Sequence, residues 1–490
     1  MYKISIIASL WPITVQNSSQ EANFCISSPK FQLGGLTSRL GGKTLSNKLK
    51  VLNLYTRNSF YYMLGHNNSP KAPQFSVLWH YICSGLLLVI LCSASVNSHS
   101  FQGLIYGKVT LTDGSVKNGI IQGKNRQLFW EDILMTLRKD NPPLKFLKSS
   151  EIKNLSDQEK KEKIEWGFMQ IWKNNYPSRT NRLSCRFGDI ASITSKGDRE
   201  ALLTLKNGST IHVEGSDKYQ DIGRYIHLSN TSGKWQRIDW KKIDKIEFEA
   251  TPSKALVTTV KPLYGTVKTR YGNLTGYVKW DQDEGMTSSI LDGKEDGVLK
   301  KIRFWKISSI ARITDNSSLV MLSDGTEMTL TDTDDVGTSN HGLIIFVRNV
   351  GAVTVKWKDF IDVNFDKAQD GSKLLAYDSF KPTEALSGWI KTNGGEKITG
   401  RIVYDLDEQW GSDMLEGYKE GLNYRIPFGS IRSIVRKNEQ ESLIVLHSGT
   451  KIVLGGQADV NDKNWGFLMW TNPEKPQYIP WNQVQIVYFK

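Results

Sequence analysis

The stretch Gly276–Glu284, GYVKWDQDE, returns later in the chain as Gly400–Glu408, GRIVYDLDE. From Gly276–Phe365 to Gly400–Phe489 the two copies align without a gap at a constant offset of 124 residues (400 − 276 = 489 − 365). An internal repeat of this length is typical of tandem structural modules. The repeat therefore decides how the chain is divided.

A third copy lies before the other two. Residues 187–248 align without a gap to residues 304–365 (304 − 187 = 365 − 248 = 117), and the hairpin before them, YGKVTLTDGSVKNGII, matches YGTVKTRYGNLTGYV. The sequence therefore predicts module 1 at residues 104–250, module 2 at 263–366 and module 3 at 386–490. Short polar links with Pro and Gly separate them.

Each module has an apolar pattern of period two, rich in β-branched and aromatic residues and broken by Gly turns. In module 2 we expect strands within residues 265–280, 302–313, 318–330, 342–347 and 353–365. Turn signals every 8 to 12 residues are typical of small barrels and sandwiches. The predicted fold class is all-β: three tandem small β-barrel or β-sandwich modules, the first with a helical insertion.

In its pattern of strands and turns, the module resembles the Sm-like and Src-homology-type small barrels. Residues 104–490 also resemble a family of uncharacterised exported bacterial proteins with a module of the form G-[YFR]-[IV]-x-[WY]-D-x-D-E, here GYVKWDQDE and GRIVYDLDE. The resemblance implies an exported, all-β protein and no particular activity.

The insertion in module 1, residues 125–181, contains one predicted helix. Ser156 and Glu159 form a capping box, and Ile164, Phe168, Ile171 and Trp172 follow at helical spacing. We expect this apolar stripe to pack across the β module; binding to a partner is the alternative.

The first 98 residues favour export. Residues 1–70 are predicted to be a disordered leader, unless translation starts at Met63. Residues 71–98 combine a basic flank, an apolar run at residues 75–96 and the small residues Ser93-Ala94-Ser95. This pattern predicts a cleaved signal peptide, with an uncleaved membrane anchor as the alternative. The expected location is the periplasm or cell surface of a bacterium.

Charge and cysteine content exclude two classes of function. Of the net charge of +13, residues 1–100 carry +7 (eight Lys and Arg against Glu21) and residues 138–182 carry +5 (eleven Lys and Arg against six acids), which leaves the repeats themselves nearly neutral. Neutral modules give no electrostatic footprint for nucleic acid. Beyond residue 98, Cys185 is the only cysteine, so no disulfide is expected within the mature chain. The sequence has no CxxC pair, the motif that would suggest a zinc or redox function.

Comparing the three copies separates residues of the fold from candidate site residues. Glycines and large apolar residues recur in all three copies, and acids recur only in modules 2 and 3. At period two along a strand, the two aspartates of the motif are expected to share one face. Carboxylate and amide oxygens are calcium ligands. The candidate metal ligands are Asp281, Asp283, Glu284, Asp335 and Asn340 in module 2, and Asp405, Asp407, Glu408, Asp459 and Asn464 in module 3. The alternative is that these side chains cap turns by accepting backbone N–H groups.

These patterns predict a non-catalytic binding or structural protein of a bacterial cell envelope, stabilised by Ca²⁺ if the acids bind metal. Its partner would be a protein or a glycan, held by tryptophans that the copies do not share: Trp280, Trp305, Trp389, Trp410, Trp465 and Trp470. Core packing is the alternative role for these tryptophans. Two other functions stay open: a glycan hydrolase that uses the D-x-D-E carboxylates, and a membrane-anchored sensor domain.

Overall fold

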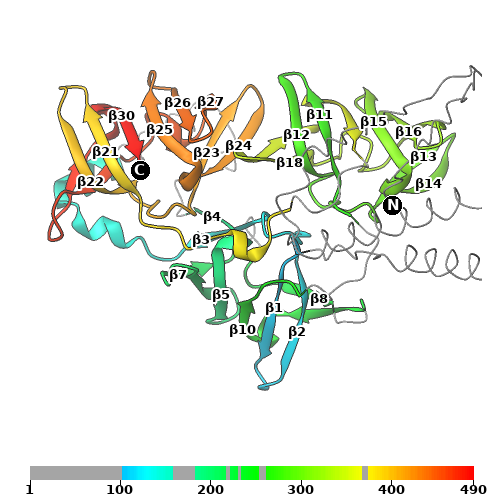
Figure 1. Ribbon diagram of the computed structural model, residues 1–490, viewed down its shortest axis with the longest axis horizontal. Coiled ribbons are helices and arrows are strands. Elements are labelled where there is room, and N and C mark those ends of the chain that lie inside the picture. The colour runs from blue at the N-terminus through cyan, green and yellow to red at the C-terminus, as the bar shows by residue number, and fades with distance from the viewer. Residues whose placement is uncertain (1–101, 158–181, 217–220, 230–232, 253–260, 367–373) are drawn as a thin grey trace, which may run out of the picture. The chain divides into compact units, whose positions relative to one another are not determined.

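The computed structural model describes residues 102–157, 182–216, 221–229, 233–252, 261–366 and 374–490. All of them belong to one of two compact units, residues 97–490. The leader, the predicted signal or anchor and the apolar stripe from Ile164 to Trp172 lie outside the described residues. Figure 1 shows that the described part is built almost entirely of strands, which confirms the all-β prediction.

Among the described residues, each module contains ten strands. Module 1 has β1 (Tyr106–Leu111), β2 (Val116–Gly123), β3 (Ile133–Arg138), β4 (Arg182–Arg186), β5 (Ile190–Ser195), β6 (Glu200–Leu205), β7 (Thr210–Glu214), β8 (Tyr225–Ser229), β9 (Trp235–Asp239) and β10 (Ile243–Phe248). Module 2 has β11 (Tyr264–Thr269), β12 (Gly272–Lys279), β13 (Ile290–Glu295), β14 (Val298–Arg303), β15 (Ile307–Thr314), β16 (Ser317–Leu322), β17 (Glu327–Thr331), β18 (Leu343–Val347), β19 (Gly351–Val355) and β20 (Phe360–Phe365). Module 3 has β21 (Ser387–Thr392), β22 (Lys397–Tyr404), β23 (Met414–Lys419), β24 (Leu422–Pro427), β25 (Ile431–Arg436), β26 (Glu441–Leu446), β27 (Lys451–Gly455), β28 (Phe467–Trp470), β29 (Gln477–Ile479) and β30 (Val484–Phe489).

The three modules have the same strand order, and every pairing is antiparallel. In module 1 the order is β4-β3-β7-β6-β5-β10-β1-β2-β8-β9. Adding ten or twenty to each number gives the pairings of modules 2 and 3. A further pairing, β19 with β24, joins modules 2 and 3 into one sheet of 20 strands. Among the described strands no pairing closes a module into a barrel.

Two corners recur in every module, where the chain passes from one strand to the next through a 3-10 turn. They lie at the recurring aromatic residues: η3 (Phe187–Asp189), η5 (Phe304–Lys306) and η9 (Phe428–Ser430), and η4 (Trp240–Lys242), η6 (Trp357–Asp359) and η11 (Trp481–Gln483). The predicted strands at 302–313 and 353–365 are therefore each two strands around a corner. Burial of the aromatic ring holds the bend: Phe304 and Phe428 are at most 2% exposed.

Glycines in the middle of the second hairpin strand allow close strand contact. A Cβ on Gly119, Gly276 or Gly400 would lie 2.0, 2.2 or 2.1 Å from a carbonyl oxygen of the neighbouring strand. No side chain fits at such a distance, which is why this position is Gly in all three copies.

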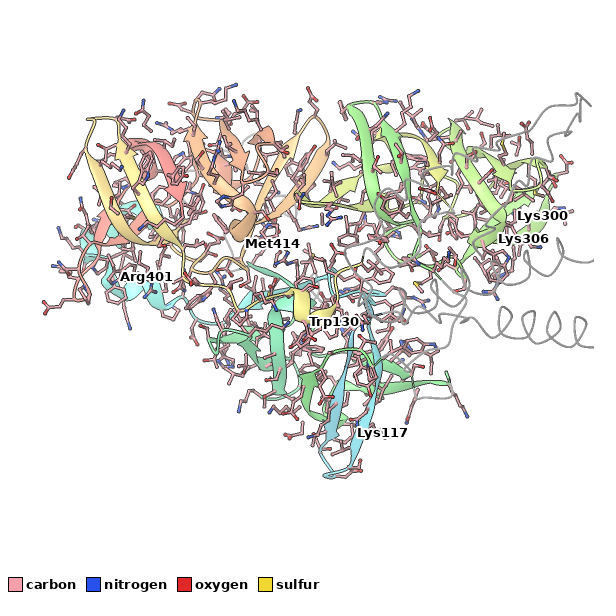
Figure 2. All side chains as sticks on the ribbon, viewed as in Figure 1. Lys117, Trp130, Lys300, Lys306, Arg401 and Met414 are labelled. Carbon is pink, nitrogen blue, oxygen red and sulfur yellow. The ribbon has the colours of Figure 1, made fainter. Side chains whose placement is uncertain are left out.

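The cores are aromatic. Trp280 is fully buried in module 2 and meets Phe360 edge to face at 5.3 Å, and Tyr404 takes its place in module 3 against Phe467. In module 1 the equivalent residue is Gly123, and Trp130 (labelled in Figure 2) packs against Tyr377 from the link between modules 2 and 3. This link therefore belongs to the core of module 1.

The helix of the insertion begins earlier than predicted. Residues 149–157 are helical, and the carboxylate of Glu151 accepts the backbone N–H of Lys148 at 2.6 Å, which caps the helix start. The prediction that Ser156 is the N-cap is wrong, because Ser156 already lies inside the helix. Leu155 packs with Val403, Leu406 and Leu468 of module 3. Other 3-10 turns are η1 (Pro142–Phe146), η8 (Tyr377–Ser379) and η10 (Ala458–Val460).

Candidate functional site

The D-x-D-E motif forms a tight turn at the end of β12. The backbone N–H of Trp280 donates to the carbonyl of Glu284 at 2.8 Å, and Asp281 and Gln282 have positive φ angles of 47° and 65°. Asp405 and Leu406 repeat this geometry at 45° and 65°. Two successive left-handed residues are typical of a type I′ turn. The expectation that both aspartates share one strand face is wrong, since side chains alternate only along an extended backbone.

The first aspartate of the motif ties the turn to the loop before β18, the strand that pairs with β12. Asp281 Oδ1 accepts the backbone N–H of His341 and lies 3.0 Å from Nδ1 of the same histidine. In module 3, Asp405 accepts the backbone N–H of Trp465. Because the donor is the backbone, this contact does not depend on the residue type at position 341 or 465. It is the turn-capping role predicted as the alternative to metal binding.

The candidate aspartate outside the motif, Asp335 in module 2 and Asp459 in module 3, accepts a backbone N–H group of a neighbouring strand. Asp335 Oδ2 accepts the backbone N–H of Asp292 in β13 at 2.5 Å, and Asp459 Oδ2 accepts that of Glu416 in β23 at 2.6 Å. Burial raises the pKa of Asp335 to about 6 and that of Asp459 to about 7. One oxygen of each carboxyl is thus committed to the backbone.

The two asparagines shape their own loops. Asn340 Oδ1 accepts the N–H of Gly342 at 2.7 Å, and its Nδ2 donates to the carbonyl of Asp335 at 3.0 Å. Asn464 repeats both contacts, with Gly466 at 2.8 Å and Asp459 at 3.3 Å. Their amide oxygens accept a backbone N–H rather than facing an open ligand position.

Module 1 contains an equivalent aspartate that the sequence comparison missed. Asp221 Oδ2 accepts the backbone N–H of Met135 in β3 at 2.7 Å, which is the contact that Asp335 makes in module 2. Asp221 was missed because the constant offset of 117 places it opposite Thr338, three residues from Asp335. Allowing a gap in the loop before β8 is the signal that finds it.

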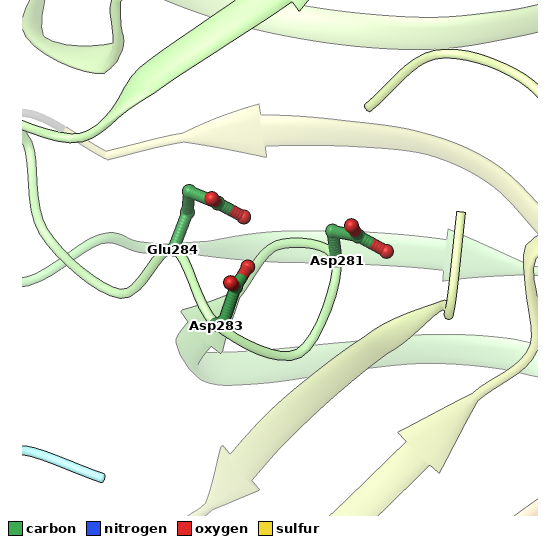
Figure 3. Close-up of side chains that lie close together, drawn as sticks. All are labelled: Asp281, Asp283 and Glu284. Atoms are coloured by element: carbon green, nitrogen blue, oxygen red, sulfur yellow. The ribbon is translucent and has the colours of Figure 1, made fainter. Parts of the chain in front are cut away.

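The last acid of the motif corresponds to a neutral amide in module 1. Gln127 occupies the position of Glu284, and its Nε2 donates to Asp221 Oδ1 at 2.7 Å. Burial, followed by a hydrogen bond with Asp283, raises the pKa of Glu284 to about 10. Figure 3 shows the carboxyl groups of Asp283 and Glu284 close together and that of Asp281 directed away from them. Glu284 therefore carries a proton at neutral pH and resembles Gln127 chemically.

Three of the five predicted ligands in module 2 come close enough to hold one ion. One oxygen from each of Asp281, Asp283 and Glu284 fits within a group whose members lie at most 4.8 Å apart. Asp283 Oδ1 and Glu284 Oε2 are buried oxygens without a hydrogen-bond partner. Asp335 and Asn340 take part in the backbone contacts described above. With one oxygen from each of its three carboxyl groups, the site supplies half or less of the six to eight oxygens that Ca²⁺ usually takes, so second carboxyl oxygens, backbone carbonyls or waters would have to complete the shell.

In module 3 a guanidinium group occupies the acidic turn. Arg138, at the end of β3, is 7% exposed; its Nη1 lies 2.9 Å from Asp407 Oδ2 and its Nη2 lies 3.0 Å from Asp413 Oδ1. Glu408 is 8% exposed, and burial raises its pKa well above the ordinary value. The positive charge at this turn therefore comes from module 1.

The buried site at Asp407 and Asp413, which holds a cation from another module, is called a socket here. Module 1 has an equivalent socket, which accepts a lysine from module 2. Asp132, which aligns with Asp413, receives Lys279 Nζ at 3.3 Å, and the same ammonium lies 3.2 Å from the carbonyl of Arg126. In both sockets the other aspartate oxygen accepts two backbone N–H groups at 2.6 to 3.0 Å. These buried pairs fix module 1 against modules 2 and 3.

A cavity of about 370 Å³ lies where the three modules meet. Aromatic side chains of module 2 form one wall: Tyr264, Tyr277 and Phe346. Arg348 of module 2 and Glu131 and Arg186 of module 1 supply charge, and Met414 and Pro427 of module 3 complete the lining. No single module contains this site, so a search within one repeat could not find it.

The three charged side chains of the cavity differ in how freely they can contact a ligand. Arg186 is held by Asp189 through Nε at 2.7 Å and stacks over Phe380. Arg348 is exposed. Burial raises the pKa of Glu131 to about 7, although Arg186 and the backbone N–H of Leu375 favour its ionised form. Glu131 therefore changes charge near neutral pH while lining a cavity.

Comparisons with family models, curated proteins and solved structures find no match for this chain. Within the described ranges, no helix combines the length and apolar character needed to span a bilayer.

Proposed function

We propose that this chain is a non-catalytic glycan-binding protein of a bacterial envelope and that its ligand site is the cavity between the three modules. The observation that carries the proposal is the composition of that cavity, which is lined by the aromatic rings of Tyr264, Tyr277 and Phe346 together with the charged side chains of Glu131, Arg186 and Arg348. Its volume of about 370 Å³ lies in the range of small-ligand sites.

The aromatic wall suits one face of a sugar ring. Tyr264 and Tyr277 meet edge to face at 5.2 Å, and Tyr277 and Phe346 are at most 8% exposed, so the wall is rigid. The C–H face of a pyranose is apolar and packs on such rings, which are also enriched at binding surfaces that are apolar at one end and wet at the other. A rigid wall lowers the entropic cost of binding.

The polar end suits the sugar's hydroxyl groups. A carboxylate accepts hydrogen bonds and a guanidinium donates them in a fixed fork. Glu131 can therefore accept the O–H of one sugar hydroxyl, and Arg348 can donate to the oxygen of the hydroxyl next to it. Few convergent polar groups on an apolar wall are typical of sites that orient a ligand without reacting with it.

The alternative of a glycan hydrolase at the D-x-D-E motif has less support. In module 3, Arg138 covers Asp407, and Glu408 is 8% exposed, so no sugar reaches these acids without displacing module 1. In module 2, Asp283 and Glu284 are neighbours in one turn, with carboxyl oxygens within 4.8 Å of each other, whereas an acid and a nucleophile must flank the scissile bond.

A second proposal concerns Ca²⁺ in module 2 alone. The close carboxyl groups of Asp281, Asp283 and Glu284 support it, and the proton on Glu284 is its competitor. Export and envelope location rest on the apolar run at residues 75–96, and a retained anchor would make the chain a membrane-bound sensor. We further propose that each ten-strand module packs as a small sandwich around its aromatic core.

A glycan array tests the main proposal. We expect the wild-type chain to bind a group of related glycans and Arg348→Ala to lose that binding. Arg432→Ala is the matched control, since Arg432 is an exposed arginine of β25 that does not line the cavity. Binding by Arg348→Ala equal to that of the wild type would contradict the proposal.

A further inference from the structure

The joint between modules 2 and 3 is a pairing of two sheet edges. β19 pairs with β24 in the register Ala352 to Arg425, Thr354 to Asn423 and Val355 to Leu422. β19 is the last strand in the order of module 2 and β24 the first in that of module 3. The modules are thus able to associate by adding one edge to another.

The same edge of module 2 is free among the described strands. β14 is the equivalent of β24 and pairs only with β13. Val298 is 60% exposed, whereas its equivalent Leu422 is 3% exposed under β19. Leu299 beside it is 52% exposed. An edge strand with two neighbouring exposed apolar residues is a template for another strand.

Module 1 carries the complementary edge. β9 is the equivalent of β19 and pairs only with β8 among the described strands. Trp235 is 44% exposed, whereas its equivalent Ala352 is 5% exposed against β24. Within one chain, module 1 is held elsewhere by Arg138 and Lys279. Its β9 is therefore available to another molecule.

We propose that β14 is a docking edge for β9 of a second copy of this chain. Transferring the register of the β19–β24 joint places Ile238 opposite Val298, Arg237 opposite Leu299 and Trp235 opposite Lys301. The joint buries the exposed apolar groups of both edges and satisfies their open backbone groups.

The charges allow this pairing and disfavour the symmetric one. Lys301 pairs with Asp292 at 3.4 Å, as Arg425 pairs with Glu416 at 3.2 Å in the β19–β24 joint, so a charge at this position is tolerated. Lys300, labelled in Figure 2, pairs with Glu295 at 3.2 Å. Two antiparallel β14 strands would bring several cations together, and like charges across strands are destabilising.

The remaining equivalent of β19 is a poorer partner. β29 has only three residues and follows Pro476, which stands where β19 has Ala352. Proline cannot donate to a strand pair and is typical of protected edges. Tyr478 in β29 packs beside Leu155 from the helix of module 1. β9 is therefore the better partner for β14, and neither strand lines the ligand cavity.

Sedimentation of the full chain tests the proposal. The wild type is expected to associate as its concentration rises, and Val298→Lys to remain monomeric because the lysine would face Ile238. Ile313→Lys, at a 55% exposed position of β15, is the matched control and should associate like the wild type. A monomeric wild type, or association by Val298→Lys equal to that of the control, overturns the proposal.

Cysteine pairing tests the register directly. Two samples, Arg237→Cys and Leu299→Cys, are prepared with serine at Cys25, Cys83 and Cys92 and then mixed under oxidation. Because these positions face each other, the mixture should form a disulfide-linked dimer that neither sample forms alone. Arg237→Cys mixed with Lys300→Cys, one residue out of register, should link much more slowly. Equal linkage by both mixtures overturns the register.

Discussion

At the residue scale, the glutamates of the repeated turn should make the protein less stable as pH rises. The folded state holds a proton on Glu284 up to a pKa of about 10, whereas the unfolded state releases it near 4.5. Since the folded state binds more protons between these values, the free energy of unfolding falls as pH rises through that interval. Glu284→Gln keeps the neutral form and should raise Tm relative to the wild type by about 2–4 °C at alkaline pH, with no gain at acidic pH.

Thermal melts across that pH range, with the exposed Glu474→Gln as control, check this prediction. A Tm difference that does not change with pH would contradict it. Repeating the melts with Ca²⁺ and with a chelator tests the metal proposal, because Ca²⁺ should stabilise the wild type and not Glu284→Gln.

Arg138 gives a second prediction at this scale. Arg138→Met leaves Asp407 and Asp413 buried without their cation, which should cost about 3–5 kcal/mol in free energy of unfolding. Urea denaturation measures the loss. Adding Asp407→Asn and Asp413→Asn should recover part of it, whereas Arg432→Met should change little. Full stability of Arg138→Met alone would mean that the pair is not buried as described.

Glu131 gives a third prediction, on binding. With a pKa of about 7, its carboxyl becomes ionised as the pH rises through neutrality, and only the ionised group accepts hydrogen bonds through both oxygens. Affinity for the glycan should therefore increase several-fold from about pH 6 to about pH 8. Titrations at both ends of this range check it, and Glu131→Gln should remove the pH dependence. A wild-type affinity independent of pH would exclude Glu131 from the site.

At the scale of the element, the second hairpin strand requires glycine where the backbone of a neighbouring strand passes close to it. Gly400→Ala places a Cβ 2.1 Å from the carbonyl oxygen of Trp470 and must separate β22 from β28. We expect a loss of about 1–3 kcal/mol in free energy of unfolding. In Gly394→Ala of the same module the new Cβ has no neighbour closer than 3.8 Å, so chemical denaturation should show little change. Equal stability of the two variants would contradict the predicted strand contact.

Period-two patterning predicts most strands, but it misses β13 and all but the last two residues of β14. Ile290–Glu295 ends in polar and charged residues, and its pairing with β14 follows from long-range contacts. The 3-10 corners were hidden for the opposite reason, because Phe304 and Trp357 look like strand residues while their burial bends the chain. The turn type at Asp281 was also hidden, since two left-handed residues usually include Gly or Asn.

At the scale of the whole molecule, the repeat predicts three copies of one fold and not what they form together. Comparison of the copies singled out the acidic turn, but nothing in the repeat indicates that Arg138 and Lys279 pair with aspartates of other modules. The cavity likewise combines side chains more than 200 residues apart, such as Glu131 and Phe346. Contacts of this kind depend on docking of modules and leave no periodic signal in the sequence.

Calorimetric titration with a glycan that binds on the array tests the central claim most directly. The number of ligands bound per chain distinguishes a single site at the junction of the three modules from a site repeated in each module. A site at the junction predicts one ligand per chain, lost in Tyr264→Ala and kept in Tyr418→Ala, a tyrosine of β23 that does not line the cavity. Two or three ligands per chain would place the site within the repeated module. Binding unchanged by Tyr264→Ala would contradict the account.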